Sequence, residues 1–376
     1  MRKIVVPILA GFLLSACSSS KNSFSKRGDA AIIQQGFINC FDTIIVDGLN
    51  NPVHCEASAV VLSDKSLIIA SDKELPGNKL SPVFSIPLTS SFAPVIPAAS
   101  VSYLANEPFL NVRKIEDMTK EPSGNICFAT TGFDRIRDTT AAMDPYNSLL
   151  YWQENDYNSI RYVAETIDNG FKSSKSLRNH FIKALATDRE PNGPAYFKIE
   201  AICALPDSTL LFGVRETGAS YADMDYACIV LSTKYHVSNN VLTLDTVFKK
   251  CFELKPKETI GIDAALSGIA YNKYRKEIYF STSVEEFSNT DSIRLSAYLW
   301  KVSLNDFHQQ KPTQVINDKS GHPMRIDHKV EGITFISKNL LFTISDQDRS
   351  LSPVLINGVM IDRKPYQAVY SVIKLK

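Results

Sequence analysis

Short apolar runs alternate with polar turns along almost the whole chain, and five of these runs share one pattern. In each, an apolar residue precedes a polar first slot, a turn follows, and a second apolar run leads to a second polar slot 15 or 16 residues on. Repeats of short strands at intervals of 60, 84, 67 and 64 residues are typical of radial blades. The pattern predicts an all-β fold, a β-propeller of five four-stranded blades, and six blades only if the long second interval hides one. The first slots are Glu56, Glu116, Glu200, Ser267 and Glu331, and the second slots are Asp72, Gly132, Glu216, Ser283 and Asp346.

Two irregular stretches refine this prediction. The last repeat has only three strand-like runs, whereas residues 32–46 form a strand-like run that belongs to no repeat. Pairing the two would close the ring and cover an exposed sheet edge, so we expect the N-terminal strand to be the outer strand of the last blade. Residues 175–187, inside the long interval, have apolar side chains at helical spacing, which predicts a short helical insertion in the second blade.

The N-terminus has the features of an export signal. A short basic stretch precedes an apolar run that is too short to span a bilayer, and Leu14-Ser15-Ala16-Cys17 resembles a bacterial lipobox. We therefore expect a signal peptide over residues 1–16, a lipid on Cys17 that anchors the chain to a membrane, and a polar, flexible tether over residues 17–28. Residues 29–376 show no second composition and are expected to form a single domain. Ser18, with no acid beside it, favours an outer-membrane lipoprotein of the bacterial cell envelope.

The charge balance excludes one class of partner. Lys and Arg number 41 against 40 Asp and Glu, and no basic stripe is visible, so nucleic acid is not an expected partner. The repeats also show no dense cluster of Lys and Arg of the kind that a highly phosphorylated substrate would need. We expect a monomer.

Six cysteines remain once Cys17 carries lipid, and an even number in an exported chain is compatible with disulfides. Cys228 and Cys251 flank two apolar runs around Asn239-Asn240, a pair suited to a two-residue hairpin turn. A turn centred there places the two cysteines opposite each other, at about 4.5–5.5 Å, which a disulfide can bridge. We predict this bridge, with Cys40 and Cys55 as further candidate partners across the ring closure. Cys127 and Cys203 lie in apolar strands and are expected to be buried thiols.

The repeat that begins at Lys198 and ends in Arg215-Glu216 resembles the repeat of the phytase-like ("esterase-like activity of phytase") β-propellers and their exported relatives. Residues 330–335, followed by residues 343–346, resemble it more closely still. The resemblance implies a propeller that holds calcium or a ligand at its central channel. It places Glu56, Glu116, Glu200 and Glu331 at the first acid position and Asp72, Glu216 and Asp346 at the second. The chain departs from the family pattern at Gly132, Ser267 and Ser283.

Converging carboxylates must be compensated. The first strand of each propeller blade lines the channel, so the first-slot glutamates repel one another unless protons, cationic side chains or a metal offset their charge. Calcium, which takes six to eight oxygen ligands, is the expected cofactor if a metal binds. Arg215 could instead neutralise Glu216 or a neighbouring acid, and the glutamates could also serve only as staples that accept backbone N–H groups of adjacent blades. The candidate calcium ligands are Glu56, Glu116, Glu200, Glu331, Asp72 and Asp346.

Catalytic signals are weak. The chain has neither a nucleophile-elbow Gly-x-Ser-x-Gly nor a His-Glu-x-x-His sequence. His54 and His328 precede channel acids by two or three residues and are the candidate general bases. The first hypothesis is thus a membrane-anchored propeller that binds a small ligand or an envelope protein at its channel. The alternatives are a metal-dependent phosphoesterase of the phytase-like type and a purely structural lipoprotein.

Overall fold

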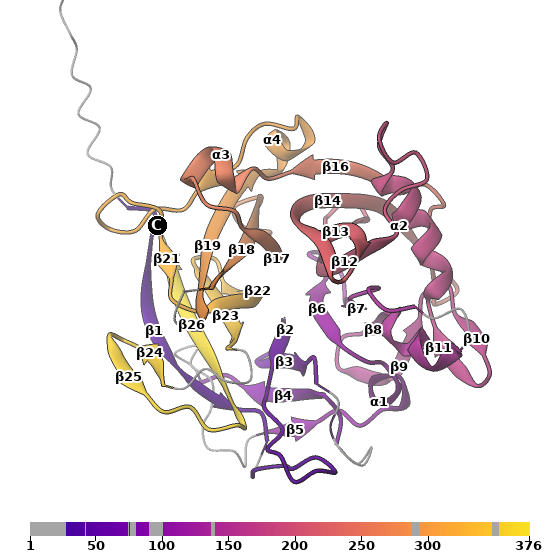
Figure 1. Ribbon diagram of the computed structural model, residues 1–376, viewed down its shortest axis with the longest axis horizontal. Helices are drawn as coiled ribbons and strands as arrows, with labels where there is room; N and C mark the ends of the chain where they lie inside the picture. Colours follow the sequence, from indigo (N-terminus) through magenta and orange to yellow (C-terminus); the bar gives the residue numbers. More distant parts are fainter. Residues whose placement is uncertain are drawn as a thin grey trace, which may run out of the picture.

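The computed structural model describes residues 28–41, 43–73, 75, 80–89, 101–136, 140–287, 293–347 and 353–376. Within this part of the chain, five antiparallel sheets surround a central channel (Figure 1). The structure is therefore a five-bladed β-propeller, as the repeats predicted. The signal peptide over residues 1–16 and the lipidation of Cys17 lie outside the described residues and stay predictions.

Each blade is an antiparallel meander whose first strand is innermost, and the five innermost strands pack against one another around the channel. Blades 3 and 4 each carry two short outer strands where four-stranded blades carry one.

Blade 1 contains β2 (Ala57–Ser63), β3 (Ser66–Ser71), β4 (Val83–Pro87) and β5 (Ser102–Tyr103). Blade 2 contains β6 (Ile115–Lys120), β7 (Ile126–Thr131), β8 (Leu149–Gln153) and β9 (Asp156–Tyr162). Blade 3 contains β12 (Tyr196–Ala204), β13 (Thr209–Ser220), β14 (Asp223–Ser238), β15 (Val241–Leu244) and β16 (Lys249–Glu253). Blade 4 contains β17 (Ala265–Asn272), β18 (Glu277–Phe287), β19 (Ile293–Ser303), β20 (Gln314–Val315) and β21 (Arg325–Ile326). Blade 5 contains β22 (Lys329–Ser337), β23 (Leu340–Asp346), β26 (Gln367–Leu375) and β1 (Ala30–Asn39).

The hydrophobic core lies between the blades. Five large clusters of buried apolar side chains occur in the described residues, one at each of the five interfaces between neighbouring blades. The inner strands are apolar on both faces because each blade is covered by a blade on either side, so their sequences read as near-continuous apolar runs. Three short helices, α1 (Glu107–Asn111), α3 (Pro256–Ile260) and α4 (Leu304–His308), connect strands at the periphery. Among the described residues, no helix has the length and apolarity needed to span a membrane.

The ring closes as the sequence predicted. β1 pairs with β26 over nearly its whole length, from Ala30 opposite Leu375 to Asn39 opposite Gln367. Beyond β1, a disulfide joins Cys40 to Cys55, just before β2, with the two Cα atoms 6.2 Å apart. The outer edge of blade 5 is thereby tied covalently to the first strand of blade 1.

The predicted disulfide between Cys228 and Cys251 is wrong, because both thiols are free. The predicted hairpin turn at Asn239-Asn240 does form, with Ser238 opposite Val241 and Tyr235 opposite Leu244. After Leu244, however, the chain leaves β14, returns as β16 in a shifted register, and a bulge displaces it again. Cys228 therefore lies beside Leu254, whose N–H donates to the Cys228 carbonyl, and Cys251 lies in the bulge.

The long second interval contains no sixth blade in the described residues. It holds a two-stranded hairpin, β10 (Thr166–Asp168) and β11 (Phe171–Ser173), and the predicted helix, α2 (Arg178–Leu185), which follows a 3₁₀ turn. Phe181 of α2 is buried among Phe133, Phe197 and Phe212, so α2 packs over the interface between blades 2 and 3.

Candidate functional site in the central channel

The first-slot residues share a backbone irregularity. Glu116, Glu200, Ser267 and Glu331 each lie where the register between the first and second strands of their blade shifts by one residue. Such β-bulges kink a strand and redirect a side chain. In blade 1 the same irregularity falls at Ser58, two residues after Glu56. In blades 2 to 5 the bulges thus explain how apolar inner strands, buried on both faces, can still direct a polar side chain into the channel.

The three departures from the acidic pattern, one in blade 2 and two in blade 4, each have a local compensation. At Gly132, an added Cβ would lie 3.1 Å from Asp134 Oδ1 and from Glu116 Oε1, because the Asp134 carboxylate takes the place that a second-slot acid would fill. In blade 4, Ser267 and Ser283 both accept hydrogen bonds from Arg215 Nη1, at 2.7 and 2.6 Å. Arg215 Nη2 also donates to Glu285, two residues after Ser283, at 2.9 Å. Every blade therefore contributes at least one carboxylate to the channel.

Lysines accompany these carboxylates. Lys114, Lys198 and Lys329 each lie two residues before a first-slot glutamate, and Lys73 follows the second slot of blade 1. Lys73 pairs with Glu56 at 2.6 Å, Lys114 with Glu116 at 2.8 Å and Lys329 with Glu331 at 2.9 Å. Lys198 pairs with both Glu200 and Glu116. Each first-slot glutamate thus has an ammonium partner.

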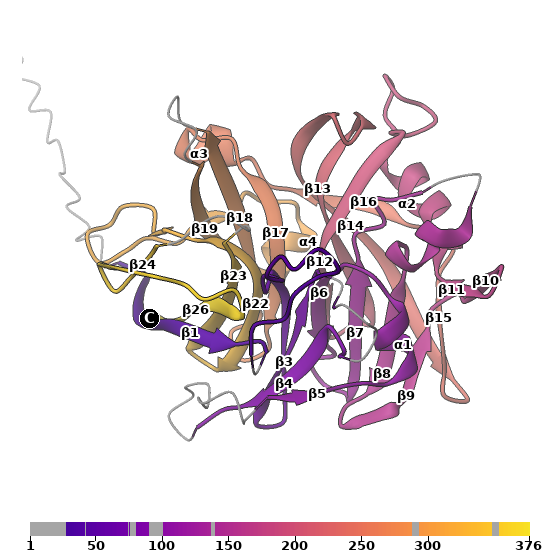
Figure 2. The same ribbon diagram turned by 60° about the horizontal axis from the view of Figure 1, so that its bottom comes forward.

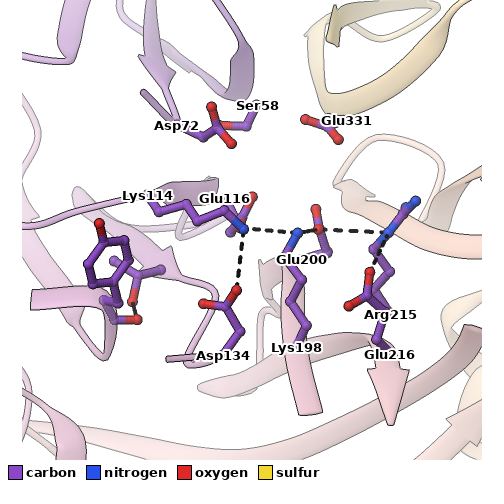
Figure 3. A network of polar contacts seen from close by, with 12 residues as sticks. Ser58, Asp72, Lys114, Glu116, Asp134, Lys198, Glu200, Arg215, Glu216 and Glu331 are labelled. Carbon is purple, nitrogen blue, oxygen red and sulfur yellow. Dashed lines mark hydrogen bonds and ion pairs between the residues drawn. The ribbon is translucent and has the colours of Figure 1, made fainter. Parts of the chain in front are cut away.

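These ion pairs form a continuous network across blades 2 and 3 (Figure 3). From Lys114 it runs through Glu116, Lys198 and Glu200 to Arg215, whose Nε lies 3.8 Å from Glu200 and 3.5 Å from Glu216. Asp72 and Glu331, from blades 1 and 5, face this network from across the channel in Figure 3.

Two other buried residues act as staples between adjacent blades. Ser58 Oγ donates to the Ile115 carbonyl and so links blade 1 to blade 2. Asp117, next to Glu116, accepts the N–H of Met118 at 2.8 Å and that of Ile202, in blade 3, at 2.9 Å. These buried hydrogen bonds join adjacent blades and leave the neighbouring glutamates to the channel.

Burial and shared lysines separate the pKa values of the channel carboxyls. Burial raises the pKa of Glu116 to about 7, and Glu200 adds to the rise while Lys114 and Lys198 oppose it. Burial alone would also raise the pKa of Glu200, but Lys198 and Arg215 lower it to about 2. Burial raises the pKa of Asp72 to about 6 despite Lys73, and burial beside Glu331 holds the pKa of Asp346 well above its usual value. Near neutral pH, the channel therefore contains both ionised and protonated carboxyls.

The network lines an open cavity of about 630 Å³. This volume lies within the range of about 300–1,000 Å³ that is usual for small-molecule sites. Tyr196, Tyr221 and Tyr226 form part of the wall, and the Tyr196 hydroxyl donates to Glu216 at 2.6 Å. The predicted residues that line the cavity are Glu56, Asp72, Glu116, Arg215, Glu216, Glu331 and Asp346, whereas Glu200 lies buried next to it.

The candidate general bases lie elsewhere. Neither His54 nor His328 is among the residues that line the cavity. His328 is buried, and this burial lowers its pKa although Gln347 and Asp327 act in the opposite direction. No catalytic role follows from these positions.

The sequence carries a signal for the channel lysines. Residues i and i+2 of a strand point to the same face, so a lysine two residues before Glu116, Glu200 and Glu331 predicts a cation beside three of the four acids. Residue types counted along the chain showed no basic cluster, yet the fold brings Lys73, Lys114, Lys198, Lys329 and Arg215 to one cavity.

The raised pKa values predict that stability falls as the pH rises through neutrality. Asp72 and Glu116 bind protons more tightly in the folded state, so their contribution is fully present below about pH 4 and is lost as the pH rises through their folded pKa values of about 6 and about 7. The raised pKa of Asp346 acts in the same direction. Glu200 and Glu285, whose pKa values are lowered, contribute stability that is lost as the pH falls below about 4.5. His328, with its lowered pKa, opposes the three raised carboxyls below pH 6.5. We expect the free energy of unfolding to fall by roughly 2–4 kcal/mol between pH 5 and 7.5.

Urea unfolding at pH 4.5, 5.5, 6.5 and 7.5 measures this slope directly. An Asp72→Asn variant should show a flatter profile because it lacks one of the titrating groups. Stability that is constant or rises between pH 5 and 7.5 would show that these carboxyls are ionised in the folded protein.

Comparisons with known proteins identify neither a family nor an activity. No protein-family model matches the chain, and no curated protein matches it. A solved Bacteroides thetaiotaomicron protein, provisionally described as a phosphatase, is 10% identical with a TM-score of 0.36; the alignment covers 85% of this chain and 61% of that protein. A glycoside hydrolase family 43 β-1,3-galactosidase is 8% identical over 88% of this chain and 93% of its own, with a TM-score of 0.39. The catalytic domain of the Coprinopsis cinerea family 62 α-L-arabinofuranosidase is 9% identical over 91% of this chain and 97% of its own, with a TM-score of 0.41. These similarities carry no information about the activity of this chain, and the resemblance to phytase-like propellers stays a prediction.

Proposed function

We propose that this protein is a membrane-anchored propeller of the bacterial cell envelope that binds a small anionic ligand in its central cavity. One observation supports the proposal above the others. The lysine side chains are more exposed to the cavity than the glutamates with which they pair: Lys73 is 28% exposed and Lys114, Lys198 and Lys329 are 14% each, against 5%, 2%, 1% and 6% for Glu56, Glu116, Glu200 and Glu331. In each of these four pairs the ammonium group is therefore the more accessible partner, while Glu285 and Asp72, 17% and 13% exposed, are the most accessible acids of the lining.

The chemistry of this surface favours a ligand rich in hydrogen-bond acceptors. An ammonium group offers three donors, so Lys114 and Lys198, which each pair with two carboxylates, keep one donor for a carboxylate, phosphate or sulfate group of a ligand. The carboxylates beneath hold the ammonium groups in place, so less side-chain freedom is lost when the ligand binds. The tyrosines in the wall suit the sugar ring or carbon skeleton that would carry such a group.

Binding of defined probes tests the proposal. We expect galacturonate or inorganic phosphate to raise the melting temperature of the protein, and glucose and putrescine to leave it unchanged. Lys114→Met and Lys329→Met should each raise the dissociation constant of the anionic probes about tenfold, because each variant loses one charge-assisted hydrogen bond to the ligand. Lys234→Met, at a half-buried lysine of blade 3 that does not line the cavity, is the matched control. Binding of the neutral or cationic probe alone, or of none of the four, would contradict the proposed ligand class.

Calcium fits the channel residues poorly. The four acids of blades 1 and 5 could supply oxygen ligands, but Lys73 and Lys329 pair with them and already compensate part of their charge. No group of three or more His, Cys, Asp or Glu in the described residues is arranged to hold a metal ion. The proposed function therefore does not include calcium, and we derive no chemical step from it.

A melting experiment decides the calcium prediction. Because the ammonium groups occupy the carboxylates, we expect neither 1 mM calcium nor a chelator to change the melting temperature by more than about 1 °C. A clear rise with calcium, lost on chelation, would instead show that the metal displaces Lys73 or Lys329.

A phosphoesterase of the phytase-like type is the second candidate, because the same lysines would accept a phosphate ester. Turnover of 4-nitrophenyl phosphate that a chelator abolishes would favour it. Phosphate binding without turnover would favour the binding protein.

A further inference from the structure

Exposed aliphatic side chains gather along one edge of the propeller. Of the 16 large hydrophobic side chains that are exposed in the described residues, seven belong to β1, to the loop that follows it, and to a small hairpin of blade 5. The hairpin consists of β24 (Val354–Ile356) and β25 (Val359–Ile361). We call these three segments the N-terminal edge; its exposed residues are Ile33, Ile44, Val46, Leu49, Val359, Met360 and Ile361.

The three segments are contiguous. The hairpin turn touches β1, since Asn357 N–H donates to Gln35 Oε1 at 3.1 Å. The base of the loop touches the chain that follows the hairpin, since the N–H groups of Cys40 and Cys55 donate to the carbonyls of Tyr366 and Pro365, both at 2.8 Å. Figures 1 and 2 both show the hairpin beside β1 at the outer rim of blade 5.

The exposed residues are held in fixed positions. Val354 and Ile356 of β24 pack with Phe37 and Val369, which attaches the hairpin to the blade. The other strand of the hairpin, β25, is exposed to solvent. In the loop, Asp47 Oδ1 accepts the N–H groups of Leu49 and Asn51 at 2.8 and 2.9 Å. This turn, within a loop closed by the Cys40–Cys55 disulfide, leaves Leu49 82% exposed. Clustered aliphatic residues on fixed supports mark an interaction surface, because isolated ones would need no explanation.

The place where the chain enters the fold indicates what covers this edge. β1, the central segment of the edge, is joined through twelve residues, Ser18 to Asp29, to the predicted lipid on Cys17. Twelve residues span at most about 43 Å when extended and about 19 Å as a flexible coil. The N-terminal edge is therefore held close to the bilayer at an effective concentration in the millimolar range, where even a weak contact is occupied. The exposed side chains of β25 are uncharged and aliphatic, and such side chains suit the acyl boundary of a lipid leaflet.

We propose that the N-terminal edge rests on the membrane that holds the lipid anchor, with Leu49 and the β24–β25 hairpin in contact with lipid. The proposal rests on the anchor that forms part of the proposed function, and it is independent of the ligand of the cavity. It orients the protein, because the edge belongs to the outer rim of blade 5 whereas the cavity lies at the inner strands. The propeller then lies with its rim on the membrane, and the cavity stays open to solutes.

Quenching by brominated lipid tests the contact in the full chain. The two native tryptophans, Trp152 and Trp300, are 1% and 0% exposed inside the blades, so lipid bromines do not reach them. The lipidated Met360→Trp and Leu49→Trp proteins are each reconstituted in vesicles of brominated phosphatidylcholine. We expect the introduced tryptophan to lose about half of its fluorescence emission there. Val247→Trp, at a residue of blade 3 that is 69% exposed, is the matched control and should not be quenched.

Three outcomes would overturn the proposal. Vesicle-bound protein in which neither Met360→Trp nor Leu49→Trp is quenched would show that the anchor holds the protein away from the lipid. A dimer in detergent, with the same tryptophans shielded from a soluble quencher, would assign the edge to a second copy of the chain. An N-terminal peptide without lipid by mass spectrometry would remove the local concentration on which the contact depends, while probe binding to the cavity, measured in detergent, would still report on the proposed function separately.

Discussion

Replacing Arg215 with methionine is expected to destabilise the protein by about 3–5 kcal/mol, the usual cost of removing one partner from a buried ion pair. Arg215 is 2% exposed and pairs with the carboxylates of Glu200, Glu216 and Glu285. Its Nη1 also donates hydrogen bonds to the hydroxyl groups of Ser267 and Ser283. Methionine has a similar length and fills most of the volume, so the loss would report the missing charge rather than a cavity. Urea unfolding of Arg215→Met against the parent protein measures the effect.

Two further variants show whether the loss arises from the unpaired acids. Arg189→Met, at an exposed arginine of the loop after α2, should change stability by less than about 0.5 kcal/mol. Arg215→Met combined with Glu200→Gln should recover part of the loss, because the buried carboxylate that Arg215 compensates is then neutral. If the double variant is as unstable as the sum of the single ones, Arg215 acts through its hydrogen bonds to the two serines.

The channel network also shows why a repeated sequence motif predicts the acids of such a site but not the contacts between blades that complete it. The acids of Glu56, Glu116, Glu200 and Glu331 could be identified because each occupies the same place in its repeat. Ser267 and Ser283 looked like losses from the pattern, since nothing in their own blade indicates that a guanidinium from blade 3 reaches them. Contacts between blades depend on the fold rather than on spacing within a repeat, and a repeat pattern carries no information about them.

More of the fold than of the channel site could be predicted from the sequence, because the signals for strands, turns and helices are local. Alternating apolar runs, turn residues and the unpaired N-terminal run predicted the blades, the ring closure and the helix α2 at residues 178–185. The disulfide prediction failed for the opposite reason: the turn at Asn239-Asn240 is a local feature, whereas the pairing of Cys251 depends on an excursion and a bulge further along. The register that a hairpin turn sets cannot be extrapolated past an inserted residue, because each insertion shifts every pair that follows it.

The disulfide that does form gives the second large effect. Replacing both Cys40 and Cys55 by alanine is expected to destabilise the protein by about 3 kcal/mol, the loop-entropy value for a bridge between residues 15 apart. The loss should exceed that of an isolated loop, because this bridge ties the outer strand of blade 5 to the first strand of blade 1 and so secures the ring closure. Removing both thiols together avoids new pairing with Cys251, which is only half-buried.

Three measurements distinguish this bridge from the one that the sequence suggested. Cys40→Ala/Cys55→Ala should lower the urea midpoint and speed hydrogen exchange in β1, whereas Cys251→Ser should change the midpoint little. Peptide mapping without reductant should recover residues 40 and 55 in one linked fragment, and reductant should lower the stability of the parent protein but not that of the double variant. A comparable loss from Cys251→Ser, together with a linked Cys228–Cys251 fragment, would mean that β16 pairs with β14 in the register extrapolated from the turn. The ring closure would then depend on the hydrogen bonds between β1 and β26 alone.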